Sequence, residues 1–199
     1  MIDAMQWVAV SAQGGVHLPA VRAAADEKGW RTVELHEVHP LEALDDAVAE
    51  AAEDAGGTAH DEAGSALGVA LHADGYLYVV AADAAGIRAR MAFGTIDVSE
   101  EGLDAIARSY PGTEIPAGWR DEQLAALVAW SAGAPRTIDP GDLPLVEPDP
   151  REEVVRLFVA LGLSMPSRGT GPWTELRDAA RDRAPETPVR RKRRGLFRR

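Results

Sequence analysis

The C-terminal segment holds the residues whose types and spacing most clearly suggest chemistry. Seven of its ten side chains are basic: Arg190, Arg191, Lys192, Arg193, Arg194, Arg198 and Arg199. The whole chain has a formal net charge of -11, so the rest of the chain is strongly acidic in contrast to this basic segment. Guanidinium groups bind phosphate and carboxylate oxygens in pairs. The segment therefore predicts binding to an anionic partner, which could be nucleic acid, acidic lipid or an acidic protein.

Leu196 and Phe197 form an apolar wedge between the arginines of this segment. Such a wedge can enter a bilayer interface or stack on a nucleic-acid base, and the sequence leaves both open. Two other interpretations also stay open: contact with the acidic body of the same chain, and a solvated end without a binding role. Pro185 and Pro188 precede the segment and predict that residues 185–199 form a disordered basic tail.

Histidines suggest metal binding, but their spacing matches no established motif. His36 and His39 are one residue closer together than the two histidines of His-Glu-x-x-His. At the end of a strand they would point to opposite faces. His60 and Asp61 fall in a predicted loop and could add ligands. His36, His39 and His60 are therefore weak metal candidates, and the sequence predicts neither a metal nor a cofactor.

Catalytic motifs are absent from the sequence. No serine lies in a Gly-x-Ser-x-Gly context, and Gly14-Gly15 belongs to no phosphate-binding pattern. The chain has no cysteine, which excludes disulfides and thiolate chemistry. Acidic residues between positions 45 and 54 are expected to form a solvated helix face rather than an acid–base pair: Asp45, Asp46, Glu50, Glu53 and Asp54.

Composition indicates a folded bacterial protein of the cytoplasm. The 199 residues are 46% hydrophobic, which is enough for a core. The N-terminus lacks the basic and apolar regions of a signal peptide, and no apolar run approaches the roughly 18 residues of a membrane span. Arginine greatly outnumbers lysine, and alanine and glycine are abundant, which is typical of GC-rich bacterial genomes.

The elements of the first half predict a sheet assembled from two kinds of unit. Strands at 5–11 and 31–37, with a helix at 18–28 between them, would form a parallel crossover. A second helix is expected after Pro40, with Leu41, Leu44 and Val48 in its apolar stripe.

The next stretch predicts a three-stranded antiparallel meander. Asp74-Gly75 and Asp83–Gly86 supply turns between alternating apolar strands. Arg88 and Arg90 are expected to share one face of the last strand. The expected core residues are Leu67, Val69, Leu71, Leu77, Val79, Ile87 and Met91.

The second half is expected to be helical. Ser99 and Asp121 are predicted N-caps of two helices, the second covering 122–131. Asp149-Pro150 predicts another helix start, with Gly162 as its end, and a last helix is expected at 172–183. The fold class is thus α/β or α+β with a mixed sheet. The predicted division is a domain at 1–132, a connector at 133–148, a helical section at 149–184 and the tail at 185–199.

Two hypotheses of function follow. The first is a non-enzymatic interaction or accessory protein whose basic tail contacts an anionic partner. The alternative is a small-molecule-binding or hydrolytic enzyme with a pocket at the sheet edge, near Arg88, Arg90 and the loops of His36 and His60. The absence of a catalytic motif favours the first hypothesis, although residues that are distant in sequence can assemble a site without a local signature.

Overall fold

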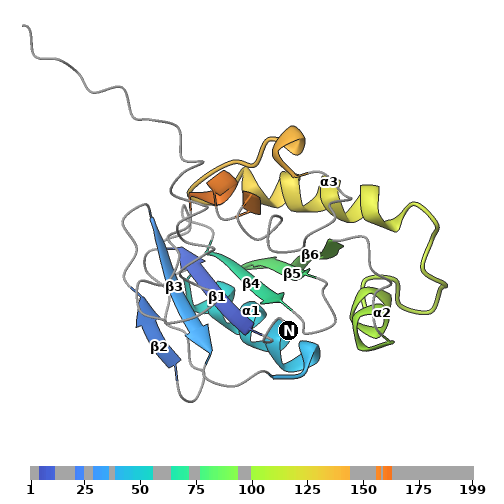
Figure 1. Cartoon of the computed structure of the whole chain (residues 1–199), viewed down its shortest axis with the longest axis horizontal. Coiled ribbons are helices and arrows are strands. Elements are labelled where there is room, and N and C mark those ends of the chain that lie inside the picture. The colour runs from blue at the N-terminus through green and yellow to red at the C-terminus, as the bar shows by residue number, and fades with distance from the viewer. Residues whose placement is uncertain are drawn as a thin grey trace, which may run out of the picture.

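A six-stranded antiparallel sheet organises the part of the chain that the structure describes (Figure 1). The computed structural model describes residues 5–11, 21–24, 29–35, 39–55, 64–71, 77–93, 100–143, 156–157 and 159–162. The strands are β1 (Met5–Ser11), β2 (Val21–Ala24), β3 (Trp30–Leu35), β4 (Ser65–Leu71), β5 (Leu77–Asp83) and β6 (Gly86–Phe93). They lie in the order β2-β3-β1-β4-β5-β6, and each neighbouring pair is antiparallel. The described residues therefore form an α+β fold, as expected for one of the two predicted classes.

The predicted parallel crossover in the first 37 residues is wrong. Val21–Ala24, inside the expected helix at 18–28, forms β2 and pairs with β3. Strand β3 pairs directly with β1 in the antiparallel sense, with Trp7 opposite Glu34 and Ser11 opposite Trp30. A segment rich in alanine fits a helix by spacing alone, but pairing with a neighbouring strand overrides such a weak local preference. Antiparallel neighbours also need no helix between them.

The predicted meander is present as β4, β5 and β6. Val69 lies opposite Val79, and Val79 lies opposite Met91. Gly86 has a φ of 107° at the β5–β6 turn, a conformation that glycine adopts without steric cost. Six of the seven expected core residues are buried, namely Leu67, Val69, Leu71, Leu77, Val79 and Met91. Ile87 is only partly buried, because the register shifts between Ala81 and Ala82 at this end of the strand pair.

Helix α1 (Leu41–Ala55) covers one face of the sheet, as its apolar stripe predicts. A Cβ on Gly68 of β4 would lie 2.6 Å from Val48 Cγ2 and 2.8 Å from Val80 Cγ1. Glycine is therefore required for the close approach of helix and sheet at this point. Because side chains alternate along a strand, Tyr78 and Val80 of β5 face α1, and Leu77 and Val79 face away from it.

The opposite face is covered by α3 (Trp119–Ser131) and the residues that follow it. Ser65, which points to this face, donates a hydrogen bond of 3.2 Å from Oγ to the Gly133 carbonyl. Trp130 and Trp30 lie together here, with ring centroids 6.0 Å apart. Their indole N–H groups donate to the Ala82 and Leu161 carbonyls at 2.8 and 3.0 Å. Buried Leu157 and Leu161 belong to the same core cluster as the sheet residues.

Helices α2 (Glu100–Ala107) and α3 are both present as predicted, and the start of α3 differs from the predicted one. Helix α2 begins one residue after the predicted cap Ser99, which lies outside the described residues. Helix α3 begins three residues before the predicted start at Glu122, and Gly118 rather than Asp121 occupies the N-cap position. A short 3-10 helix, η1, spans Pro140–Asp142. The predicted helix start at Asp149 and the predicted helix at 172–183 lie outside the described residues, and the division into domains stays a prediction.

None of the helices that the structure describes combines the length and the apolar character needed to cross a bilayer.

Candidate functional site

The most unusual chemical group in the described part of the chain is a buried carboxylate, Asp45. It lies on α1, and only 3% of its side chain is exposed. Burying a charge is costly unless it is paired and hydrogen-bonded. The surroundings of Asp45 therefore show which residues stabilise this charge.

Two arginines converge on one oxygen of this carboxylate. Arg90 of β6 donates from Nε to Asp45 Oδ2 at 2.7 Å. Arg108, directly after α2, donates from Nε at 3.1 Å and from a terminal nitrogen at 2.8 Å to the same oxygen. Arg90 is 13% exposed and Arg108 30% exposed at the side chain. Burial lowers the pKa of Arg108, but the hydrogen bonds to Asp45 and its negative charge outweigh that and raise it.

Tyr78 of β5 completes the contacts of Asp45. Its hydroxyl donates to Asp45 Oδ1 at 2.8 Å. Burial, then the charge of Asp45 and the hydrogen bond to it, raise the pKa of Tyr78 well above its ordinary value. The tyrosine therefore stays a neutral donor. Because Oδ1 accepts from Tyr78 and Oδ2 from both arginines, Asp45 joins α1 to β5, β6 and the end of α2.

A second set of polar contacts extends this cluster toward the surface. The Arg90 backbone N–H donates to Gln123 Oε1 of α3 at 2.8 Å. Gln123 Nε2 donates to the Tyr110 hydroxyl at 3.2 Å, and that hydroxyl donates to Glu122 at 3.1 Å. Burial and the contact with Glu122 raise the pKa of Tyr110, although the bond from Gln123 opposes them. Gln123 thus gives the last strand of the sheet, β6, a hydrogen-bond partner on α3.

The prediction that Asp45 lies on a solvated helix face is wrong. The other four acidic residues of that group are exposed, as predicted: Asp46, Glu50, Glu53 and Asp54. A usable signal was present, since Asp45 follows Leu41 by four positions and precedes Val48 by three. Those spacings place it inside the apolar stripe rather than beside it. A charged residue at such a position predicts a buried ion pair, with arginines among the candidate partners.

Arg88 and Arg90 occupy different surroundings. Arg90 reaches inward to Asp45, whereas Arg88 is 46% exposed and pairs with Asp83 across the β5–β6 turn at 2.6 Å. The register shift between Ala81 and Ala82 lies beside these residues. Both arginines near the proposed enzyme pocket are therefore engaged with aspartates of the same chain.

Of the three histidine candidates, His39 lies among the described residues. His39 is half-buried just before α1, and its backbone is held by Gln6 of β1. Gln6 Oε1 accepts from the His39 N–H at 2.9 Å, and Gln6 Nε2 donates to the His39 carbonyl at 2.6 Å. His36 and His60 lie outside the described residues. Within the described ranges, no three His, Cys, Asp or Glu side chains are grouped so as to hold a metal ion.

The basic tail and its wedge also lie outside the described residues. Comparison with known proteins supplies no family. No protein-family model matches the chain, and searches of curated proteins and of solved structures found no significant match.

Proposed function

We propose that this chain is a non-enzymatic interaction or accessory protein whose basic C-terminal segment, Arg190 to Arg199, binds an anionic partner. The observation that supports this proposal most strongly is the uneven distribution of charge along the chain. Seven of the 21 basic residues lie in these ten positions, and the remaining 14 share the chain with 32 acidic residues. A binding site for polyanions on such a protein is favoured where the positive charge is concentrated.

The described surface supports the same assignment. Exposed carboxylates lie on α1, α2 and α3, as Asp46 and Glu50 on α1, Glu100 on α2 and Asp121 on α3. Two arginines that could have offered positive charge to a ligand, Arg90 and Arg108, are bonded to Asp45 instead. The described body therefore repels a polyanion on these helices, and the tail is the favoured contact.

The test compares the full chain with a chain ended at Pro188. Binding to a fluorescent DNA duplex is measured by anisotropy, and binding to vesicles containing anionic lipid by co-sedimentation. At low salt we expect the full chain to bind at least one probe roughly tenfold more tightly than the shortened chain, and the difference to shrink as salt rises. Equal binding of both chains to both probes would contradict the proposal.

A substituted full-length chain provides the matched control for chain length. Replacing the seven basic residues with glutamine should abolish the additional binding without shortening the protein. A further variant carrying Leu196→Ala and Phe197→Ala distinguishes the two probes. It should weaken vesicle binding, which needs apolar insertion, more than duplex binding, which depends mainly on phosphate contacts.

A further inference from the structure

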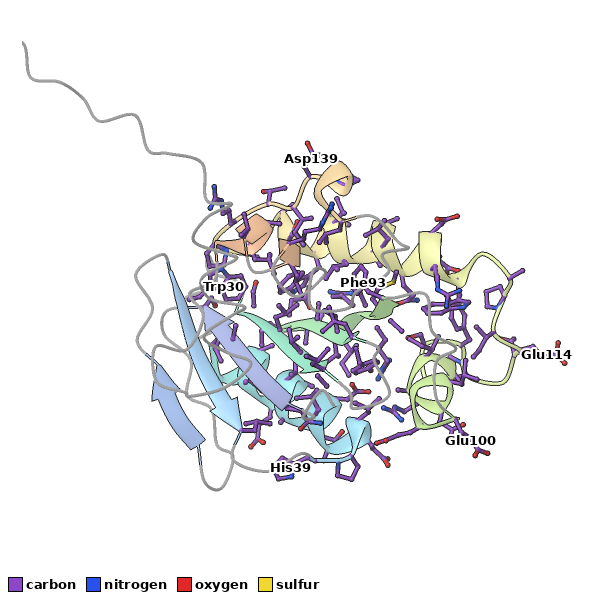
Figure 2. The ribbon with its side chains drawn as sticks, viewed as in Figure 1. Trp30, His39, Phe93, Glu100, Glu114 and Asp139 are labelled. Atoms are coloured by element: carbon purple, nitrogen blue, oxygen red, sulfur yellow. The ribbon has the colours of Figure 1, made fainter. Side chains whose placement is uncertain are left out.

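Helix α2 presents an exposed leucine beside exposed carboxylates. Its inner side is buried through Gly102, Ala105 and Ile106. Leu103 is 43% exposed, and no other large hydrophobic side chain among the described residues is exposed. Helical spacing makes Glu100 a surface neighbour of both Leu103, three positions on, and Asp104, four positions on, and both carboxylates are exposed. Figure 2 shows Glu100 pointing away from the rest of the molecule. We call Glu100, Leu103 and Asp104 the outer face of α2.

This surface is complementary to the C-terminal segment in two independent properties. The segment places an apolar pair, Leu196 and Phe197, next to basic residues, and the outer face of α2 places an apolar residue next to acidic ones. Charge complementarity fixes orientation and favours encounter, whereas the apolar contact gains free energy by removing hydrocarbon from water. We propose that the outer face of α2 is a docking surface for the chain's own C-terminal segment, with Leu103 against Leu196 and Phe197.

The length of the chain allows this contact. Twenty-eight positions separate Gly162, the last described residue, from Arg190. An extended chain of that length spans up to roughly 90–100 Å, so reach does not limit the contact. A tethered segment also meets its site at an effective concentration far above that of a free peptide. Individually weak contacts can therefore hold it.

The consequence for function is autoinhibition. The proposal rests on the proposed function, because the same basic residues are those that bind the external anion. Docking on α2 occupies them and lowers the apparent affinity for the external partner. A polyanion must then displace an internal acidic competitor, which favours partners of high charge density over weak anions.

Disulfide trapping tests the contact without an external anion. The chain has no cysteine, so two can be introduced into the full-length protein without background. Ala107 lies on the last turn of α2, four positions after Leu103, and Ala125 is exposed on α3. One variant combines Ala107→Cys with Gly195→Cys, and the control combines Ala125→Cys with Gly195→Cys. The two pairs leave Glu100, Leu103, Asp104 and the wedge intact.

We expect the intramolecular disulfide to form at least about fivefold faster with position 107 than with position 125 at low salt, because docking raises the local concentration. The preference should disappear in about 1 M salt, where exposed charges are screened. Equal rates at low salt would overturn the docking proposal. A dominant intermolecular disulfide would also overturn it, since the segment would then dock on a second copy.

Anion binding tests the competition. A variant with Glu100→Gln, Leu103→Ser and Asp104→Asn removes the docking surface. A control with Glu53→Gln, Asp121→Asn and Ala125→Ser makes the same change of net charge elsewhere. We expect the first variant to bind the duplex probe about three- to tenfold more tightly than the control at low salt, by loss of the tethered competitor. Equal affinities of the variant and control would overturn autoinhibition.

Disulfide trapping and anion binding together also distinguish the docking proposal from the proposed function on which it rests. Trapping at position 107 without any tail-dependent binding to duplex or vesicles would mean that the segment docks on its own body and that the proposed function fails. Tail-dependent binding with no preference for position 107 would retain the proposed function and reject the docking surface.

Discussion

The two faces of the sheet satisfy their buried polar groups in different ways. On the α1 face, Asp45 is a charged group held by Tyr78, Arg90 and Arg108. On the α3 face, Trp30 and Trp130 are neutral donors, and each bonds to a backbone carbonyl. Removing a neutral donor deprives one carbonyl of its indole partner. Removing Asp45 leaves two guanidinium groups partly buried without their counter-charge. The α1 face therefore depends far more on a single residue.

The largest expected effect follows from breaking the charged cluster. Asp45→Ala leaves Arg90 and Arg108 without their common acceptor, and we expect a loss of about 3–5 kcal/mol in the free energy of unfolding. Asp46→Ala is the matched control, because the neighbouring carboxylate is exposed. Urea denaturation measures both variants. Similar midpoints would show that the cluster contributes little to stability.

A smaller effect is expected at Tyr78, with a characteristic dependence on pH. Tyr78→Phe removes a hydrogen bond to a charged group and should cost about 1.5–3 kcal/mol near neutral pH. Burial raises the pKa of Tyr78 in the folded state. The unfolded tyrosine releases its proton near pH 10, while the folded one retains it. Its contribution is therefore complete below that pH and is lost as the pH rises above it.

Denaturation between pH 8 and about 10.5 measures this contribution. The parent chain should lose more stability over that range than Tyr78→Phe. Tyr110, whose pKa is also raised, is present in both proteins and cancels in the comparison. Parallel decreases in stability would contradict the role assigned to Tyr78.

The α3 face supplies the neutral counterpart. Trp130→Phe keeps an aromatic ring but leaves the buried Ala82 carbonyl without its indole donor, and we expect a loss of about 1–3 kcal/mol. Trp119→Phe on the same helix is the comparison, because it makes the same substitution at another buried tryptophan. The Trp119 ring contacts the Arg120 guanidinium, whose carbon lies 4.7 Å from the ring centroid. Thermal unfolding of both variants measures the difference. A Trp130→Phe loss exceeding that of Asp45→Ala would reverse the ranking of the two faces.

The smallest effect is expected for an ion pair outside both cores. Arg88 is 46% exposed and bonds to Asp83. Solvent screens such a pair, so Arg88→Ala should cost about 0.2–1 kcal/mol. Arg90→Ala is the contrast from the same strand, because its partner Asp45 is buried. If urea midpoints show equal losses at positions 88 and 90, the distinction between exposed and buried arginines fails.

The sequence predicted the local units better than their assembly. The meander was predictable because its strands alternate apolar residues with others and are joined by short turns. Helix α1 was predictable from its stripe of apolar residues. The β1–β3 pairing was not, because an alanine-containing segment such as Val21–Ala24 fits both helix and strand and only the partner strand decides. The Asp45 cluster combines residues from positions 45, 78, 90 and 108, so no local motif records it. Its acidic member alone was accessible, from its place in the helical stripe.

The contact between α2 and the start of α1 has a consequence for how the protein folds. The Leu41 N–H at the start of α1 donates to Glu101 Oε1, a side chain sixty positions further along the chain, at 3.1 Å. The first turn of α1 therefore lacks this acceptor until α2 has docked. During synthesis, the residues from 41 onward emerge before their acceptor does. Consequently the first turn of α1 gains this stabilising bond only as part of the assembled domain, and an excised peptide of residues 41–55 would fray at its beginning.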